Sequence, residues 1–352
     1  MKKTLSFILA AALMVTMAGC GSTKNAAEAA GGKEAVQTEA AATAASDTTT
    51  AAPETAKEGS DEQLKVGLSF VSLNFPYYVR MYEQFMSEAE KNNWDVTFVD
   101  GNLDAATQLN GIQDMINNDV DVMVVSTWFI DAMEDVFAQC KDKGIPVFII
   151  GNTQNPDAIN NLIVYACGTE HYDAGFLGGT WAAKHFNGLG KTAVKMVIMS
   201  GSTEQMKQRG QGFVDGLKQG GIEVDVLNEY DVSAREDAMA STEDALTVYS
   251  DLDLVYGVSA QGSLGAYDAT VGANRTEVEV IGYDGEDEEL ELIKKGTNYI
   301  ATVTQDPAGE ATVTAEHILK YLNGESFDLI VPISAGIYCQ EGQLTSEQVL
   351  GK

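Results

Sequence analysis

The sequence predicts an α/β protein with two doubly wound lobes, each built on a parallel β-sheet. From Leu64 onward, short apolar runs alternate with amphipathic stretches of helical period. Strands that are apolar throughout are typical of parallel sheets whose two faces are both covered by helices. This body has about 290 residues, more than a single core of this kind normally contains. We therefore expect the chain to divide into two lobes.

The expected elements alternate along the body, so each helix returns the chain for the next parallel strand. The predicted strands are Lys65–Phe70, Asp95–Val99, Val120–Ser126, Pro146–Ile150, Leu162–Ala166, Val194–Met199, Val224–Asn228, Leu254–Gly257, Val278–Tyr283 and Ile300–Thr304. The clearest predicted helices are Tyr77–Lys91, Thr107–Asn117, Asp131–Lys143, Tyr172–Phe186 and Gln205–Gln219.

The N-terminal segment predicts export. Lys2 and Lys3 precede an apolar stretch that is too short to remain as a membrane-spanning helix, and small residues follow it. Met17–Cys20 resembles the lipobox of bacterial lipoproteins, although Met17 stands where Leu is usual. The resemblance implies a signal peptide of residues 1–19 and a lipid-modified Cys20. The alternative is an ordinary secretory cleavage beside an incidental cysteine.

Residues 20–63 are expected to form a flexible tether. This segment is rich in Ala, Thr, Glu, Gly and Ser and contains no aromatic residue. It cannot bury enough apolar surface to offset the entropy lost on ordering. A coil of this length reaches roughly 35 Å on average. We therefore expect an extracytoplasmic protein, anchored by lipid to the outer face of the cell membrane, in a cell with either one membrane or two.

Charge and composition exclude several classes of function. The chain has 52 acidic and 22 basic residues, and its formal net charge of -30 argues against nucleic-acid binding and against lying flat on anionic membranes. There is no C-x-x-C pair, and the three histidines are far apart, so no metal site or cofactor is expected. We expect His171, His185 and His317 to lie on helices and face solvent. No nucleophile or metal constellation supports an enzyme.

Three further cysteines follow Cys20. Cys140 lies in a predicted helix and is expected to be a small buried apolar residue. An odd number of cysteines outside the cytoplasm allows at most one internal disulfide and one free thiol.

Six short motifs occur in order along the body. They are Leu73–Tyr78, Lys143–Val147, Cys167–Thr169 followed by Ala174–Gly179, Arg209–Phe213, Ile281–Gly285 and Ala301–Pro307. Each motif alone is a weak signal. Together, from Leu64 to about Tyr338, they resemble the ribose/galactose-type periplasmic binding proteins, the substrate-binding family of sugar ABC transporters.

The resemblance implies the type I periplasmic binding protein fold, in which a three-crossing hinge joins two lobes and the ligand lies between them. The crossings would fall near Gly168, Gln305 and Ala335. The N-terminal lobe would comprise residues 64–168 plus 306–334. The C-terminal lobe and tail would comprise residues 169–305 plus 335–352. Cys167 and Cys339 would then lie near crossings, which allows a disulfide between them.

The resemblance also implies a set of ligand-binding residues, several of them just after strand ends, where open α/β sheets bind ligands. Aromatic faces would cover the apolar face of a sugar, and polar groups would bond its hydroxyls. The implied set is Asn74, Phe75, Tyr77, Tyr78, Trp128, Asn152, Lys207, Ser259, Asp284 and Gln305. At least one of Tyr77 and Tyr78 is expected to contact ligand; the alternative for either, as for Trp128, is packing within the lobe.

Three positions depart from the family pattern. Gly151-Asn152 stands where the ribose binder has Asp-Arg, Lys207 where the family often has Arg, and Ser259, with Gln261 near, where it often has Asn. Lysine is a point charge and does not replace the bidentate fork of arginine. The binding cleft is therefore expected to be less charged on one side than a ribose site, which leaves both the specific sugar and sugar as a class open.

The expected function is that of a substrate-binding lipoprotein of an ABC importer. It would bind a monosaccharide or a similar polyhydroxy compound, do no chemistry, and dock on a membrane permease with its ATPase. One alternative is a lipoprotein that signals ligand state to a membrane receptor or kinase, and another is a binder of non-sugar small molecules. A sugar-responsive repressor would need a DNA-binding segment where this chain has a signal and Cys20.

Overall fold

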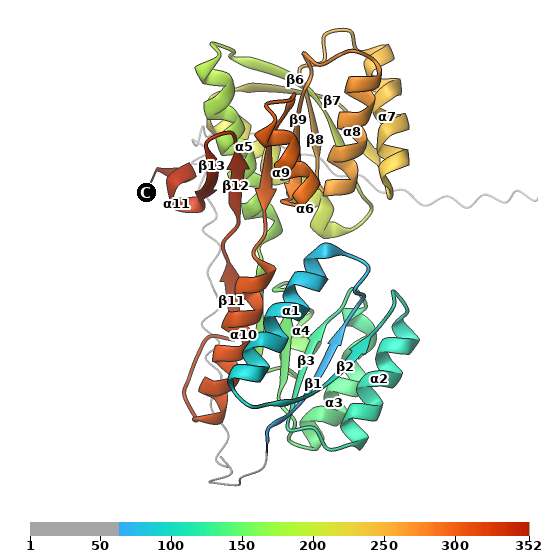
Figure 1. Ribbon diagram of the computed structural model, residues 1–352, viewed down its shortest axis with the longest axis vertical. Coiled ribbons are helices and arrows are strands. Elements are labelled where there is room, and N and C mark those ends of the chain that lie inside the picture. The colour runs from blue at the N-terminus through green and yellow to red at the C-terminus, as the bar shows by residue number, and fades with distance from the viewer. Residues whose placement is uncertain (1–62, 352) are drawn as a thin grey trace, which may run out of the picture. The chain divides into compact units, whose positions relative to one another are not determined.

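The computed structural model describes residues 63–351, and within this range the chain forms two β-sheets, each covered by helices (Figure 1). The predicted signal peptide of residues 1–19, Cys20 and the tether up to residue 62 lie outside the described residues. In the described range, no helix has both the length and the apolar character needed to cross a bilayer. The two-lobed α/β fold that the sequence predicts is confirmed.

The first lobe has a six-stranded parallel sheet within the described residues, in the order β11-β5-β4-β3-β1-β2. Its strands are β1 Lys65–Phe70, β2 Asp95–Asp100, β3 Val122–Ser126, β4 Val147–Ile150, β5 Tyr165–Thr169 and β11 Ile330–Ile333. Its helices are α1 Pro76–Lys91, α2 Ala105–Asn117, the 3₁₀ helix η1 Ile130–Met133, α3 Glu134–Asp142, α4 Asp157–Asn160 and α10 Pro307–Leu322.

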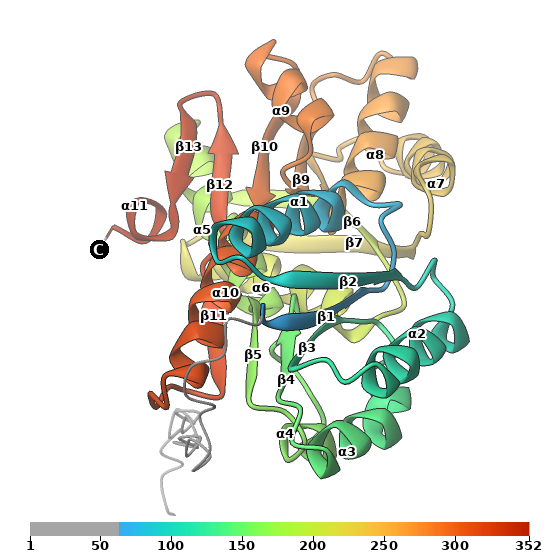
Figure 2. The ribbon, with the colours of Figure 1, turned by 60° about the horizontal axis from the view of Figure 1, so that its bottom comes forward.

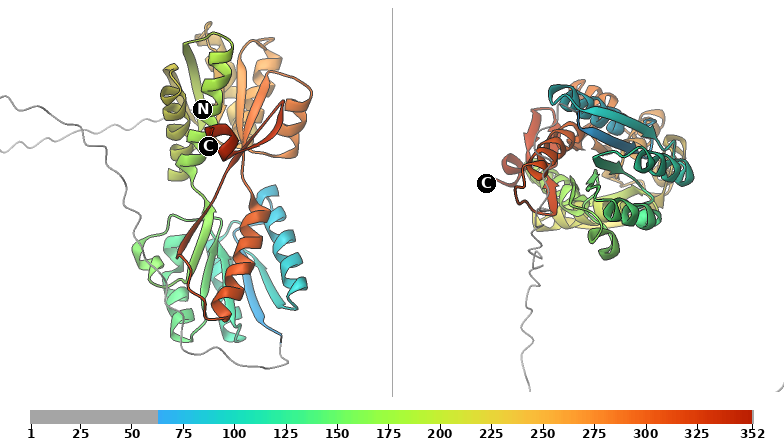
Figure 3. Two further views of the ribbon diagram at one scale, coloured as in Figure 1. Left: turned by 90° about the vertical axis from the view of Figure 1, so that its left-hand side faces the viewer. Right: turned by 90° about the horizontal axis from the view of Figure 1, so that it is seen from below.

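Both faces of the sheet are buried at its centre, which explains why β3 and β4 are almost entirely apolar, whereas the edge strand β2 contains Asp95 and Asp100. Helices α1 and α10 lie side by side on one face (Figure 3), and α2 and α3 cover the other (Figure 2). Successive side chains of β3 alternate between the two cores. Val122 and Val124 pack in the core under α1 and α10, whereas Met123 and Val125 pack under α2 and α3.

The second lobe has a seven-stranded sheet within the described residues, in the order β13-β12-β10-β9-β8-β6-β7. Its strands are β6 Ala193–Ser200, β7 Glu223–Asp231, β8 Leu254–Gly257, β9 Glu279–Asp284, β10 Tyr299–Thr304, β12 Gly336–Cys339 and β13 Gly342–Thr345. Its helices are α5 His171–Gly188, α6 Glu204–Gln219, α7 Arg235–Val248, α8 Ala260–Gly272, α9 Asp287–Lys294 and α11 Ser346–Leu350. Strand β12 pairs antiparallel with β10 at one edge of the parallel strands, and β13 pairs antiparallel with β12.

Most of the predicted elements are found within one or two residues of their expected ends. The strand expected at 162–166 is instead β5, Tyr165–Thr169, because the chain is still turning out of α4 at Leu162 and the strand continues through small buried residues. The helix expected at 131–143 begins as η1. Strands β11, β12 and β13 are not among the predicted strands: β11 contains Pro332, which argues against a strand, and β13 contains the polar residues Gln343 and Thr345.

Within residues 63–351, the chain passes between the two sheets three times. The first passage joins β5, which ends at Thr169, to α5. The second joins β10 to α10 through Gln305 and Asp306, and the third joins β11 to β12 through Ser334 and Ala335. Figure 3 shows these connecting segments.

Helices α5 and α6 pack unusually closely, and glycine makes this approach feasible. A Cβ atom on Gly175 would overlap the carbonyl oxygen of Arg209, and one on Gly212 would overlap the carbonyl oxygen of Tyr172. Gly175 and Gly179 of the first motif and Gly212 of the second therefore have a packing role between the two helices. These glycines are therefore evidence for the fold and carry no information about the ligand.

The cysteines are all buried free thiols in the described part of the chain. The disulfide that the sequence allowed between Cys167 and Cys339 does not form. Cys167 points into the core under α1 and α10, where its sulfur lies 3.2 Å from the Thr314 hydroxyl, while Cys339 packs in the core of the second lobe. Cys140 is buried as expected, and burial raises the pKa of its thiol to about 12.

The histidines are helical, as expected, but the expectation that they face solvent is wrong for two of them. His171 and His317 are buried. His317 lies beneath the ring of Tyr165 and beside Phe327, and His171 lies against Arg209. His185 is half-buried, with its Nε2 atom 3.0 Å from a carboxylate oxygen of Glu279.

Candidate ligand-binding site

Four aromatic residues form a cluster at the carboxyl ends of two neighbouring strands of the first lobe. We call Phe75, Tyr77, Tyr78 and Trp128 the aromatic shelf. Phe75 is the N-cap residue of α1, and Tyr77 and Tyr78 lie in the first helical turn, which begins at Pro76. Trp128 follows β3, which pairs with β1. The indole Nε1 of Trp128 donates a hydrogen bond of 2.7 Å to the hydroxyl of Tyr78.

The rings of the shelf contact one another in tilted and edge-on arrangements. The ring centres of Phe75 and Trp128 are 5.3 Å apart, and those of Tyr77 and Tyr78 are 5.0 Å apart. Tyr78 is buried, and burial raises its pKa to about 12. Trp128 is 56% exposed, the most exposed aromatic side chain in the described part of the chain. A large apolar face is therefore open at the end of the sheet.

Tyr77 is oriented by a carboxyl group on α10. Its hydroxyl donates a 2.5 Å hydrogen bond to Oε2 of Glu310, and the hydroxyl of Thr169 donates to Oε1 at 3.3 Å. Glu310 is fully buried, and burial raises the pKa of its carboxyl to about 8. Burial and the neighbouring Glu310 also raise the pKa of Tyr77. Glu310 is not among the residues predicted from the sequence, because nothing there distinguishes it from other glutamates in a helix.

A polar cluster lies at the carboxyl ends of neighbouring strands of the second lobe. Asp284 is the last residue of β9, and Gln305 follows β10, which pairs with β9. The Gln305 amide donates to Oδ1 of Asp284 at 3.0 Å, and the backbone N–H of Ala260 donates to Oδ2 at 3.0 Å. Burial raises the pKa of Asp284, and its φ of 107° is a strained backbone conformation for a non-glycine residue.

Arg209, which is not among the predicted ligand-binding residues, supplies a cation to this cluster. Its Nη1 atom lies 3.6 Å from Oδ1 of Asp284 and donates to the carbonyl of Val258 at 3.0 Å. Its guanidinium carbon lies 3.9 Å from the ring centre of Tyr283. Its Nε atom lies 3.3 Å from Nδ1 of His171, which accepts this bond as a neutral ring. Burial and the charge of Arg209 lower the pKa of His171 to about 3.

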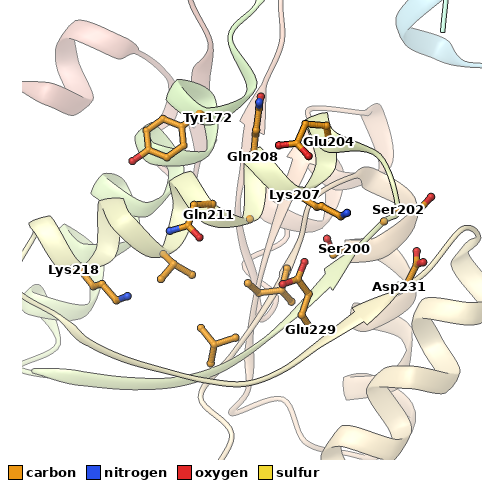
Figure 4. Close-up of a pocket in the computed structure, with 15 residues that line it drawn as sticks. Tyr172, Ser200, Ser202, Glu204, Lys207, Gln208, Gln211, Lys218, Glu229 and Asp231 are labelled. Carbon is orange, nitrogen blue, oxygen red and sulfur yellow. The ribbon is translucent and has the colours of Figure 1, made fainter. Parts of the chain in front are cut away.

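Lys207, the cation that the family resemblance points to, lies elsewhere. Residues two apart on a helix point in different directions, so Lys207 and Arg209 leave α6 on different sides. Lys207 is exposed and lines a cavity of about 910 Å³ between α6 and the strands β6 and β7 (Figure 4). No other residue of the predicted set lines this cavity. The motif Arg209–Phe213 already contained the residue that pairs with Asp284.

The remaining predicted residues are engaged locally. Asn152 bonds within its own turn, donating from Nδ2 to Oδ1 of Asn155 at 3.1 Å and accepting from the backbone N–H of Gln154 at 3.1 Å. Ser259 caps α8, accepting from the backbone N–H of Gly262. It lies next to Ala260, which bonds Asp284. Asn74 is exposed beside the aromatic shelf.

The structure thus assembles two groups from the predicted set: the aromatic shelf on the first lobe, and Ser259, Asp284 and Gln305 on the second. Aromatic faces, a carboxylate and an amide offer apolar contact and strong hydrogen-bond acceptors, which suit the binding of a polyhydroxy compound. Among the residues that the structure describes, no group of three or more His, Cys, Asp or Glu side chains could hold a metal ion.

Comparison with known proteins identifies the family. A model of the periplasmic binding protein domain matches residues 66–326. The ribose import binding protein RbsB of Haemophilus influenzae is 24% identical over 273 residues, which cover 76% of this chain and 89% of that protein. RbsB of Bacillus subtilis is 26% identical over 266 residues, covering 74% of this chain and 83% of the relative.

A solved structure shows the same fold. It is an ABC transporter periplasmic solute-binding protein from Actinobacillus succinogenes with bound D-allose, and it superimposes with a TM-score of 0.71 at 19% identity, over 82% of this chain and all of that one. This likeness and the two-sheet topology support the type I periplasmic binding protein fold. The chain belongs to the periplasmic binding protein family.

Proposed function

We propose that this chain is the substrate-binding protein of an ABC importer and that it binds a monosaccharide or a similar polyhydroxy compound between its lobes. The family and its ribose-importing relatives support this proposal. One structural observation carries it: the aromatic shelf, with its exposed Trp128, lies at the strand ends of one lobe, and a polar cluster around Asp284 lies at the strand ends of the other. Rings can cover the C–H face of a sugar while Asp284 accepts from its hydroxyls.

The binding chemistry follows from desolvation. The carboxylate of Asp284 already accepts from Gln305 and Ala260 and lies near Arg209, so it is oriented before ligand arrives. A ligand hydroxyl would donate to a free lone pair of this carboxylate in a charge-assisted bond. A ligand that lacks this hydroxyl would leave the carboxylate desolvated and unsatisfied, so the site would reject it.

We propose that the lobes comprise residues 64–168 plus 306–334 and residues 169–305 plus 335–352, and that they close on the ligand by motion at the three passages. Closure would bring the two groups of side chains onto opposite sides of one ligand. The protein would do no chemistry and would present its closed form to a permease. A lipid on Cys20 and the tether of residues 20–63 would keep it at the outer face of the membrane.

Calorimetry of the full chain, purified in detergent, tests the ligand class. The panel is D-ribose, D-allose, L-arabinose, D-galactose, xylitol and myo-inositol. We expect saturable binding of at least one of these compounds. If none binds, the ligand is not of this class, and mass spectrometry of whatever is retained through purification would identify the alternative, a non-sugar small molecule.

Metabolic labelling with palmitate tests the anchor. The unmodified chain should incorporate label and remain with washed membranes, whereas Cys20→Ala should do neither. An unlabelled, freely released wild-type protein would contradict lipid anchoring without affecting the proposed ligand.

Ligand-dependent stimulation of a permease ATPase in proteoliposomes would favour import over the alternative of signalling to a membrane receptor.

A further inference from the structure

The carboxyl group of Glu310 connects the aromatic shelf to a passage between the sheets. Its Oε2 atom accepts from the hydroxyl of Tyr77 at 2.5 Å, and its Oε1 atom accepts from the hydroxyl of Thr169 at 3.3 Å. Tyr77 belongs to the shelf, and Thr169 is the last residue of β5 before the first passage. One buried side chain therefore contacts both a candidate ligand residue and a strand end at the hinge.

Glu310 also lies at the end of a short segment that begins in the polar cluster. The second passage runs through Gln305 and Asp306 into the first turn of α10, which contains Glu310. At the start of this segment, the Gln305 amide donates to Asp284. Six residues of chain, 305–310, thus contact the polar cluster at one end and the aromatic shelf at the other.

Burying a carboxyl group is costly unless its oxygens are hydrogen-bonded, so an apolar residue would serve a purely packing role better. The two side chains that donate to the Glu310 carboxyl are Tyr77 and Thr169. Around them, Cys167 and Thr314 approach the Glu310 backbone carbonyl, and the acidic Asp306 caps the same helix. The hydrogen bonds of the carboxyl are thus made to the hinge strand and to the ligand shelf.

We infer that Glu310 is a positioning residue for ligand binding. It holds the Tyr77 side chain next to the first and second passages of the chain between the sheets. Ligand contact with the aromatic shelf is thereby coupled to motion at the hinge. This inference rests on the proposed binding function. The second lobe offers a matched comparison. Glu289 is also fully buried and accepts a hydrogen bond from a tyrosine, Tyr299, but its partners Ser263 and Thr302 all lie within the second lobe.

The first test measures affinity by calorimetry for the panel compound that binds most tightly. Glu310→Leu and Tyr77→Phe should each weaken binding about tenfold, because each removes the same hydrogen bond. The double variant should be no weaker than the worse single variant. Glu310→Gln should retain most of the affinity, since its amide oxygen still accepts from a hydroxyl. Tyr299→Phe, the control, should lower stability and leave affinity unchanged.

Additive losses in the double variant, or unchanged affinity in both single variants, would overturn the inference. A ligand-free measurement separates this failure from a failure of the proposed function. Hydrogen exchange of the backbone amides in residues 167–171 and 305–310 should be faster in Glu310→Leu and Tyr77→Phe than in wild type, and unchanged in Tyr299→Phe. If no panel compound binds, the proposed ligand class fails. Unchanged exchange in both segments would independently reject the role of Glu310.

Discussion

The guanidinium of Arg209 lies 3.6 Å from the carboxylate of Asp284. The same group lies over the ring of Tyr283 and donates to a backbone carbonyl, so Arg209 is fixed by the second lobe and does not depend on ligand for its position. Asp284 is held in turn by Gln305 and by the N-terminus of α8. The charged part of the candidate site is therefore preorganised within one lobe.

Replacing Asp284 with Asn should weaken ligand binding roughly 10- to 100-fold, because charge-assisted hydrogen bonds to ligand hydroxyls are lost and Arg209 loses its counter-charge. Calorimetry with the panel compound that binds measures this effect. Asp231→Asn removes an exposed carboxylate from the same lobe and should leave affinity unchanged. Equal affinity of the Asp284 variant and wild type would argue against a ligand role for this residue.

The Arg209→Lys variant should lower both the melting temperature and ligand affinity, although the charge is kept. Lysine cannot stack on Tyr283 while donating to Val258 and facing Asp284. A loss of about 2 kcal/mol in stability corresponds to roughly 4–8 °C. Lys218→Met removes an exposed cation from the same helix and should change neither quantity. Thermal unfolding with and without ligand distinguishes the two variants.

Trp128→Ala should separate binding from stability. The side chain is 56% exposed and loses one hydrogen bond, to the Tyr78 hydroxyl, so its truncation should cost about 1 kcal/mol of folding free energy, whereas a stacked ligand would lose about tenfold in affinity. The control is Leu189→Ala, which truncates a side chain of similar exposure, 58%, that is far from the shelf residues in sequence. This variant should change neither the folding free energy nor the ligand affinity. If Trp128→Ala bound ligand as well as wild type, the exposed indole would not contact ligand.

The buried carboxyls predict a stability that falls as pH rises. Burial raises the pKa of both Glu310 and Glu289 to about 8, whereas the unfolded chain releases these protons near the ordinary glutamate value. The folded state therefore binds more protons between about pH 4.5 and 8, and each group lowers the free energy of unfolding across that window. The maximum slope is ~1.4 kcal/mol per pH unit for each group.

Urea unfolding at pH 5, 6, 7 and 8 tests this dependence. Glu310→Gln and Glu289→Gln stay neutral throughout, so each variant should gain stability relative to wild type as pH rises. An unchanged pH slope in both variants would mean that the two carboxyls ionise normally in the folded protein.

Gly175→Ala should destabilise the second lobe by about 2 kcal/mol or more, because the added methyl group overlaps the Arg209 carbonyl and forces α5 and α6 apart. Gly188→Ala, on the same helix, has open space around its Cβ position and should stabilise slightly or be neutral. Chemical denaturation measures both changes. Equal stabilities would show that α5 and α6 can separate at no cost.

The candidate site could be predicted only in part. The aromatic shelf and the Asp284–Gln305 pair follow strand ends, a position that a periodic sequence reveals. Glu310 and Arg209 lie on helices. Neither the charge of a residue nor the hydrophobic periodicity of a helix indicates which of its side chains points toward a strand end. Tyr77 illustrates the limit: its position in the first turn of α1 was predictable, but its bond to a residue 233 positions away was not.

The two-lobed α/β class and the order of the elements can be predicted from the sequence because strands buried on both faces must be apolar and alternate with helices, and the six motifs indicate the family. Tertiary packing, by contrast, selects the side chains that come into contact. It kept Cys167 and Cys339 apart in separate cores, buried His171 against Arg209, and joined Glu310 to Tyr77 and Thr169. Such pairings depend on how helices pack on a sheet, which local periodicity does not encode.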